Sequence, residues 1–223
     1  MDRLVVIADM RTPFDAKFGV PRQSGTEGIV GKVVFRKPYA DPNALRGLEG
    51  YSHIWILWGF SEVEDKDFTP TVRPPRLGGN ARMGVFATRS PYRPNPIGLS
   101  VVKLLRVVAQ GEEISLEVEG VDMIDGTPVY DIKPYLPYAD AIPQAVGGWS
   151  APLADLSLKV AWDVPRPEGE LASAVERLLA QDPRPHYIED ESREYGMDYD
   201  GYSVRFVVRD GTAHVVGCEP LNR

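Results

Sequence analysis

Short runs of strand-forming residues follow one another along the first 120 residues, and no amphipathic helix separates them. β-Branched and aromatic residues dominate these runs, and Gly, Pro or Ser bounds most of them. The runs cover residues 4–7, 28–35, 53–60, 83–89, 99–108 and 113–121. In the last run Ile114, Leu116 and Val118 alternate with polar residues, as expected of a strand with one buried face. Because parallel strands need crossover connections, this pattern predicts an antiparallel sheet or barrel.

The pattern changes after about residue 148. Apolar residues recur at helical spacing over 171–179, and Pro183 ends that helix. Two strands around an Asp-Gly turn at 210–211 follow, and residues 156–162 are a further strand candidate. We therefore predict a mainly β protein, with a single antiparallel β-barrel domain over residues 1–148 and a small C-terminal α+β domain over residues 149–223.

Basic residues gather in one segment of an acidic chain. The formal net charge is −7, yet residues 68–111 carry seven Lys and Arg and no acid. Within that segment, residues 71–100 hold five Arg and five Pro, so these cations stand on a stiff backbone. Cations held in this way lose little freedom when they bind an anion, which predicts an anion site here. The alternative is that these arginines pair with carboxylates elsewhere in the fold.

Familiar catalytic patterns are absent from the sequence. Three His and one Cys stand in unrelated contexts, so no metal site is expected. There is no phosphate-binding loop, G-x-S-x-G elbow or G-x-G pair. The longest apolar run, residues 54–60, is too short to span a bilayer, and a lone Cys favours a reducing compartment. We therefore expect a cytoplasmic protein without a membrane partner, whose site is built from arginines, turns and carboxylates.

Two more stretches have the composition of a binding site. Residues 18–25, FGVPRQSG, put a guanidinium and an amide on a proline-restricted turn. Residues 124–140, IDGTPVYDIKPYLPYAD, combine a strong turn with Asp125, Asp131 and Lys133. The alternatives are a plain loop between strands for the first stretch and a tight turn with a surface salt bridge for the second.

These stretches resemble the signature blocks of the TsaA/TrmO family, and they occur in the order of that family. The resembling blocks are FGVPRQSG, ALRGLEGYSHIWILWGF, TVRPPRLGGNARMGVFATRSPYRPNPIGLSVVKL and DGTPVYDIKPYLPYAD, with LAQDPRPHY at 179–187 similar to the C-terminal motif of bacterial members. The resemblance implies a tRNA methyltransferase that depends on S-adenosylmethionine. It further implies a target nitrogen, N6 of N6-threonylcarbamoyladenosine at position 37 beside the anticodon, a single β-barrel, and a homodimer with cofactor pockets near the subunit interface.

Ten residues of this chain match the cofactor-binding positions that the resemblance implies. They are Pro21, Arg22, Gln23, Ser61, Arg89, Leu99, Ile124, Asp125, Gly126 and Thr127. Arginine and backbone N–H groups suit the carboxylate tail of S-adenosylmethionine, and turn backbone suits the edge of its adenine.

The acceptor nitrogen is a weak nucleophile, because a purine and a carbonyl delocalise its lone pair. Loss of its proton would activate it, and a nearby cation would stabilise the resulting charge. We expect Asp125 or Asp131 to accept the proton and Arg89 or Arg93 to face the charge. Because Asp125 opens the DGTP turn, we favour Asp131 for chemistry and expect Asp125 to cap its own turn and shape the cofactor site.

The remaining arginines of the basic segment suit the phosphates of the anticodon stem-loop. Arg73, Arg76 and Arg82 are the candidates, since RNA binding is largely electrostatic. Two alternatives stay open: a methyltransferase of the same fold acting on a small molecule, and a non-catalytic module that binds RNA or senses the cofactor.

Overall fold

The structure is a computed structural model that describes residues 4–63, 68–77, 81–111, 113–153, 157–184 and 190–221. The side chain of Arg76 and residues 185–187 of the C-terminal LAQDPRPHY block lie outside the described part of the chain.

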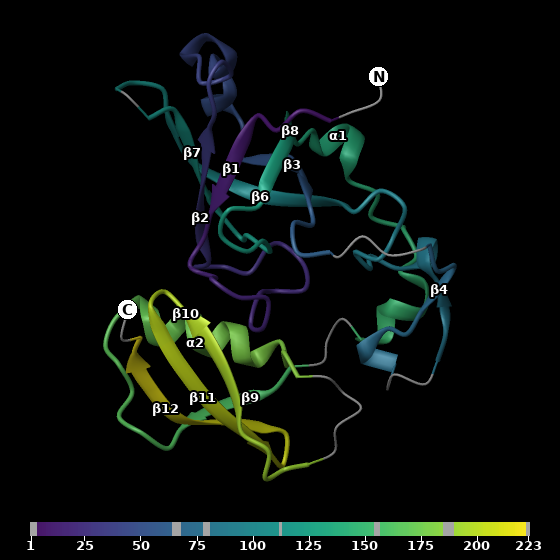
Figure 1. The fold of residues 1–223 in the computed structure, drawn as a ribbon, viewed down its shortest axis with the longest axis vertical. Helices are drawn as coiled ribbons and strands as arrows, with labels where there is room; N and C mark the ends of the chain where they lie inside the picture. The colour runs from purple at the N-terminus through teal and green to yellow at the C-terminus, as the bar shows by residue number, and fades with distance from the viewer. Residues whose placement is uncertain are drawn as a thin grey trace.

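Six strands form a closed barrel in the order β1-β2-β7-β6-β3-β8, and every neighbouring pair in it is antiparallel. Figure 1 shows this barrel in the N-terminal half of the chain. The prediction of an antiparallel barrel is confirmed. Its strands are β1 (Ala8–Arg11), β2 (Val30–Phe35), β3 (His53–Gly59), β6 (Ile97–Val108), β7 (Ser115–Glu119) and β8 (Pro128–Pro134).

Alternation along the strands fills the barrel interior. On β7 and just before it, Ile114, Leu116 and Val118 are buried, as predicted. Glu117 and Glu119 point outward and form salt bridges with cations of β6. Short 3-10 helices connect the barrel strands at Pro42–Leu45 and Leu48–Gly50, and α1 (Pro137–Asp140) follows β8.

Two strand predictions are wrong in their positions. The first barrel strand covers Ala8–Arg11, whereas residues 4–7 precede it. Residues 83–89 form only the two-residue β5 (Met83–Gly84), which pairs with β4 (Thr71–Val72) and leads into a 3-10 helix at Val85–Ala87. The prolines around β4 explain the short ladder, because a Pro has no N–H to donate. A further 3-10 helix covers Pro75–Leu77.

The C-terminal part is a four-stranded sheet with one helix. The sheet order is β10-β11-β12-β9, and β9 runs parallel to β12. The predicted helix, Asp-Gly hairpin and strand near 156–162 are all present, whereas β10 was not predicted. The elements are a 3-10 helix at Gly148–Leu153, β9 (Lys159–Trp162), α2 (Glu170–Ala180), β10 (Tyr195–Tyr199), β11 (Tyr202–Arg209) and β12 (Thr212–Pro220).

The loop between β1 and β2 joins the barrel to the C-terminal sheet. The ring of Phe14 contacts Tyr199 with centroids 5.4 Å apart. Phe18 stacks against both Tyr195 and Phe206 at 6.3 and 6.4 Å. The two parts therefore share one apolar core. In the described residues, no helix is long and apolar enough to cross a membrane.

Candidate active site

Loops at one end of the barrel carry most of the residues assigned to the cofactor. Because neighbouring strands are antiparallel, segments 12–29, 60–96 and 120–127 all leave or enter the barrel at this end. The Gly25 amide donates to the Gly120 carbonyl at 2.8 Å, which ties two of these segments together. In Figure 1 this end of the barrel faces the C-terminal sheet.

Gln23 and Arg89 meet at this end of the barrel. The Arg89 Nη1 group donates a hydrogen bond to Gln23 Oε1. Both residues are exposed, so a guanidinium and an amide are presented together to solvent. This pair can hold a carboxylate through charge-assisted hydrogen bonds.

A chain of polar groups runs from the barrel interior to the partly buried Asp122. The Trp58 indole N–H donates to Ser100 Oγ at 2.9 Å, and the Ser100 hydroxyl donates to Asp122 Oδ1 at 2.6 Å. Burial raises the pKa of Asp122 to about 6, against the opposing effects of the Ser100 hydrogen bond, the charge of Arg89 and the Ser24 amide. Sequence reasoning missed Asp122, although it stands three residues before the DGTP turn that was singled out.

The loop at Pro21 and Arg22 is held from the C-terminal side. Pro21 is buried, and Arg22 Nη2 donates to the Arg184 carbonyl at 2.9 Å. Nearby, Gln181 Nε2 donates to Thr26 Oγ1 at 2.7 Å. Residues just after α2, within the block similar to the family's C-terminal motif, thus support a loop of the candidate site.

The DGTP turn packs against the end of β1. Thr127 Oγ1 donates to the Ile124 carbonyl at 2.7 Å, and Gly126 takes a positive φ of 75° that suits a glycine. The Asp125 carboxylate accepts the Thr12 N–H at 3.0 Å and pairs with Arg11 at 3.1 Å. The expectation that Asp125 caps its own turn is therefore wrong, because its carboxylate binds the segment after β1.

Asp131 lies on the outer surface of the barrel, apart from the Asp125 carboxylate. It pairs across the strands with Leu57, and Leu57 pairs in turn with Leu99. Opposed residues share a face of the sheet, so Asp131 and Leu99 flank Leu57, roughly 10 Å apart over two strand spacings. Leu99 is half exposed, and the Asp131 carboxylate pairs with Lys133 at 2.9 Å. The structure thus groups one predicted catalytic residue with one predicted cofactor residue.

Arg93 and Ser61 are placed differently. Arg93 Nη2 donates to the carbonyls of Thr88 and Val85, at 3.2 and 3.4 Å, and so stabilises the loop that carries Arg89. Ser61 is exposed just after β3, and within the described residues no hydrogen bond joins it to the other candidates.

The cations of the basic segment divide into two groups. Lys103 and Arg106 on β6 form salt bridges with β7, so the alternative of internal pairing holds for them. Arg73 and Arg82 are exposed and form no salt bridge with any carboxylate in the described ranges. Arg82 makes a long hydrogen bond of 3.4 Å to a threonine hydroxyl.

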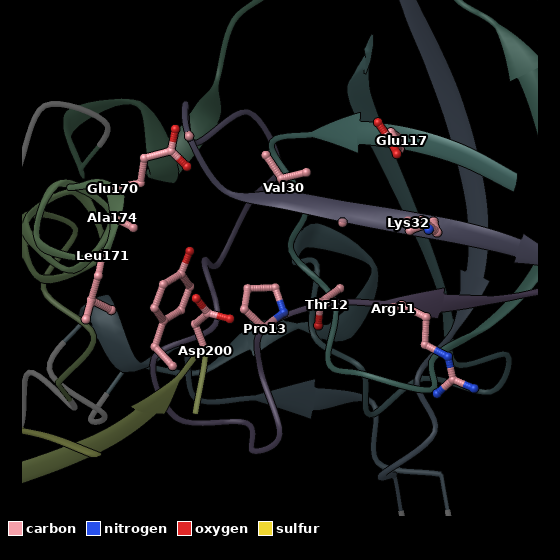
Figure 2. Close-up of a pocket in the computed structure, with 13 residues that line it drawn as sticks. Arg11, Thr12, Pro13, Val30, Lys32, Glu117, Glu170, Leu171, Ala174 and Asp200 are labelled. Carbon is pink, nitrogen blue, oxygen red and sulfur yellow. The ribbon is translucent and has the colours of Figure 1, made fainter. Parts of the chain in front are cut away.

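A cleft of about 440 Å³ separates the barrel from α2. Figure 2 shows Glu170, Leu171 and Ala174 of α2 on one side and residues 11–13 with Val30 on the other. None of the residues assigned to the cofactor lines this cleft. Over the ranges that the structure covers, no group of three His, Cys, Asp or Glu could hold a metal ion.

Comparisons with known proteins cover nearly the whole chain. The model of the tRNA-methyltransferase O N-terminal domain matches residues 9–141, and that of the TrmO C-terminal domain matches residues 157–221. The chain is 42% identical over 226 residues to a tRNA (adenine(37)-N6)-methyltransferase of Escherichia coli, covering 96% of each chain. It is 41% identical over 203 residues to a putative S-adenosylmethionine-dependent methyltransferase of Pseudomonas aeruginosa, covering 86% of each.

A crystal structure of TrmO from Pseudomonas aeruginosa superposes with a TM-score of 0.78 at 33% identity, covering 99% of this chain and 97% of the other. Both the sequence blocks and the arrangement of barrel and C-terminal sheet are therefore shared. The chain belongs to the tRNA-methyltransferase O family.

Proposed function

We infer that this chain is a tRNA (adenine(37)-N6)-methyltransferase that depends on S-adenosylmethionine. The observation that carries this function is the match to both TrmO domain models, together with a relative named for that activity that covers 96% of the chain. When bound, S-adenosylmethionine supplies an electrophilic methyl group for an in-line displacement. The protein's own contribution is to position the two reactants and exclude water.

We propose that the cofactor binds at the barrel end that carries Gln23 and Arg89. The chemistry of this end fits the cofactor: an exposed guanidinium suits the carboxylate tail, and the exposed turn at Gly126 offers backbone groups to an adenine edge. Leu99 offers an exposed apolar side chain near the same end. The other residues of the proposed site are Pro21, Arg22, Ser61, Ile124, Asp125 and Thr127.

We propose that the acceptor is N6 of N6-threonylcarbamoyladenosine and that Asp131 takes its proton. Exposure favours Asp131, because its side chain is 44% exposed and that of Asp125 is 35% exposed. Each carboxylate accepts one backbone amide and pairs with one cation: Ile132 and Lys133 for Asp131, Thr12 and Arg11 for Asp125. Arg89 is the better placed of the two cations to face developing charge, since Arg93 is occupied by backbone carbonyls.

We propose that the RNA surface includes Arg73, Arg76 and Arg82 and that it binds the anticodon stem-loop. The exposure of Arg73 and Arg82, without a carboxylate partner in the described residues, favours phosphate contacts over internal pairing. A target base beside the anticodon lies in a loop, where it can be splayed out toward a protein site. We also propose a cytoplasmic location, which a tRNA substrate favours.

We propose that the chain acts as a homodimer, with residues 1–148 as the catalytic domain and residues 149–223 supporting it. Large apolar side chains are exposed within the basic segment and after β8, including Phe86 at 74% and Val146 at 92%. The Trp149 indole donates to the Ala87 carbonyl at 2.9 Å, which brings their two segments together. An exposed apolar surface of this kind suits a contact between two copies.

Retention of labelled S-adenosylmethionine, followed by methyl transfer to total tRNA, tests the function. Retention with transfer supports it. Transfer to a small molecule but never to tRNA would contradict it, and sedimentation of a monomer alone would remove the proposed dimer.

A further inference from the structure

One face of α2 lies along the loop between β1 and β2, which carries part of the proposed cofactor site. Ala174 lines the cleft on the helix side, and Val30 lines it on the barrel side (Figure 2). Three residues further along α2, the Arg177 guanidinium lies against Gly28, where a Cβ would overlap it. Residues three or four apart share one face of a helix, so the end of this face points toward the earlier part of the loop.

Two hydrogen bonds join the chain after α2 to that loop. Gln181 Nε2 donates to Thr26 Oγ1 at 2.7 Å, and the Arg184 carbonyl accepts from Arg22 Nη2 at 2.9 Å. The turn between these two points is fixed by Asp182, which is 6% exposed and has a φ of 48°. Its carboxylate accepts two hydrogen bonds from the Arg184 guanidinium, at 2.8 and 2.9 Å. The C-terminal part therefore presents two fixed partners to the loop.

Gln23 lies between the two loop residues that these partners hold. It follows Arg22 directly and precedes Thr26 by three positions, and its side chain accepts from Arg89. On the barrel side, the Gly25 amide donates to the Gly120 carbonyl at 2.8 Å. A loop that is already ordered loses less conformational entropy when a ligand binds.

We propose that Gln181 is a positioning residue, whose hydrogen bond to Thr26 holds the loop at Gln23 in the arrangement that binds S-adenosylmethionine. This inference rests on the proposed function. It gives the C-terminal part a defined role, to order a cofactor-binding loop of the barrel, and it assigns to Gln181 no contact with the cofactor or the tRNA.

The test removes this hydrogen bond from each side. Thr26→Val keeps the shape of the side chain and removes the hydroxyl, and Gln181→Met keeps the length and removes the amide. Each should raise the dissociation constant for S-adenosylmethionine, measured by calorimetry, roughly two- to tenfold, the scale of one uncharged hydrogen bond. The double variant should bind no more weakly than Gln181→Met alone, because both changes remove the same bond.

Two controls separate positioning from general damage to the fold. Thr26→Ser keeps the hydroxyl and should bind the cofactor as the wild type does. Gln110→Met changes an exposed glutamine in the hairpin between β6 and β7, at the other end of the barrel, and should also have no effect. Single-turnover transfer at saturating cofactor should stay near the wild-type rate in Gln181→Met, because positioning of the loop acts on binding. Wild-type affinity in both Thr26→Val and Gln181→Met would overturn the proposal.

A cofactor-free measurement separates this proposal from the proposed function. The amides of Gly25 and Gly28 lie on either side of Thr26 and donate at 2.8 Å to the Gly120 carbonyl and to Glu119 Oε1. Their hydrogen exchange should be roughly two- to tenfold faster in Gln181→Met than in the wild type or in Gln110→Met. If wild-type protein retains no S-adenosylmethionine, the proposed function fails, and these exchange rates alone decide whether Gln181 orders the loop. If the rates are unchanged, the positioning role fails whatever the cofactor does.

Discussion

The free energy of unfolding of Asp122→Asn, compared with that of the wild type, should be more favourable at pH 7.5 than at pH 5. Burial raises the pKa of Asp122 from its ordinary 3.8 to about 6 in the folded state. Because the folded-state pKa lies above the unfolded value, the stabilising contribution of this group is present below pH 4 and is lost as the pH rises through 6. The full shift corresponds to about 3 kcal/mol of lost stability, since one pKa unit is about 1.4 kcal/mol.

About half of that loss falls below pH 5, and the other half, about 1.4 kcal/mol, falls between pH 5 and 7.5. An Asn at this position does not titrate, so the stability difference between Asp122→Asn and wild type should grow by about 1.4 kcal/mol in favour of the variant over this range. Urea unfolding of both proteins at pH 5 and 7.5 measures it, at one protein concentration because a dimer's stability depends on it. A difference that does not change with pH would show that Asp122 titrates normally and would refute the reasoning.

Four other variants have defined outcomes. Arg89→Ala should weaken cofactor binding and abolish turnover with an unchanged melting temperature, and unchanged affinity by calorimetry would remove this residue from the pocket. Neutralising Arg73 and Arg82 together should lower the slope of log affinity for tRNA against log salt by roughly one unit or less per lost contact, and an unchanged slope would place them outside the RNA surface. Asp131→Asn should leave cofactor affinity unaltered but slow single-turnover transfer roughly 10²-fold or more, so a normal rate would rule it out as the base. Gly98→Ala should destabilise the fold by about 1–3 kcal/mol in denaturant titrations, because the new methyl group overlaps an indole ring, and wild-type stability would show that the ring has room to move.

The barrel could be predicted from the sequence because its signals are local. Period-two alternation at 114–118 and the lack of helices between strands are both readable in a short window. The same reasoning gave a wrong prediction for residues 83–89, since their β-branched and aromatic residues are typical of a strand. Only Met83 and Gly84 pair, and their partner strand is flanked by prolines. The prolines were visible, but which segment would pair with 83–89 was not.

The sequence predicted which segments form the candidate site, but it could not predict which side chains in them are in contact. Arg89 and Gln23 were both singled out, and the structure joins them. Asp122 was missed because its partner is distant in sequence: its carboxylate accepts from Ser100, 22 positions away, and only the barrel brings the two together. The partner of Asp125 could not be predicted either, since the Thr12 amide is 113 positions away.

The most direct test of the proposed activity is the position of the transferred methyl group. Purified protein is incubated with methyl-labelled S-adenosylmethionine and with tRNA that carries N6-threonylcarbamoyladenosine without the methyl group, and the nucleosides are mapped by mass spectrometry after site-specific cleavage. The inferred function predicts label on N6 of the adenosine at position 37 and nowhere else in the tRNA, with Arg89→Ala abolishing it. Label at another nucleotide, or tRNA that stays unlabelled while the protein retains the cofactor, would contradict the inferred function.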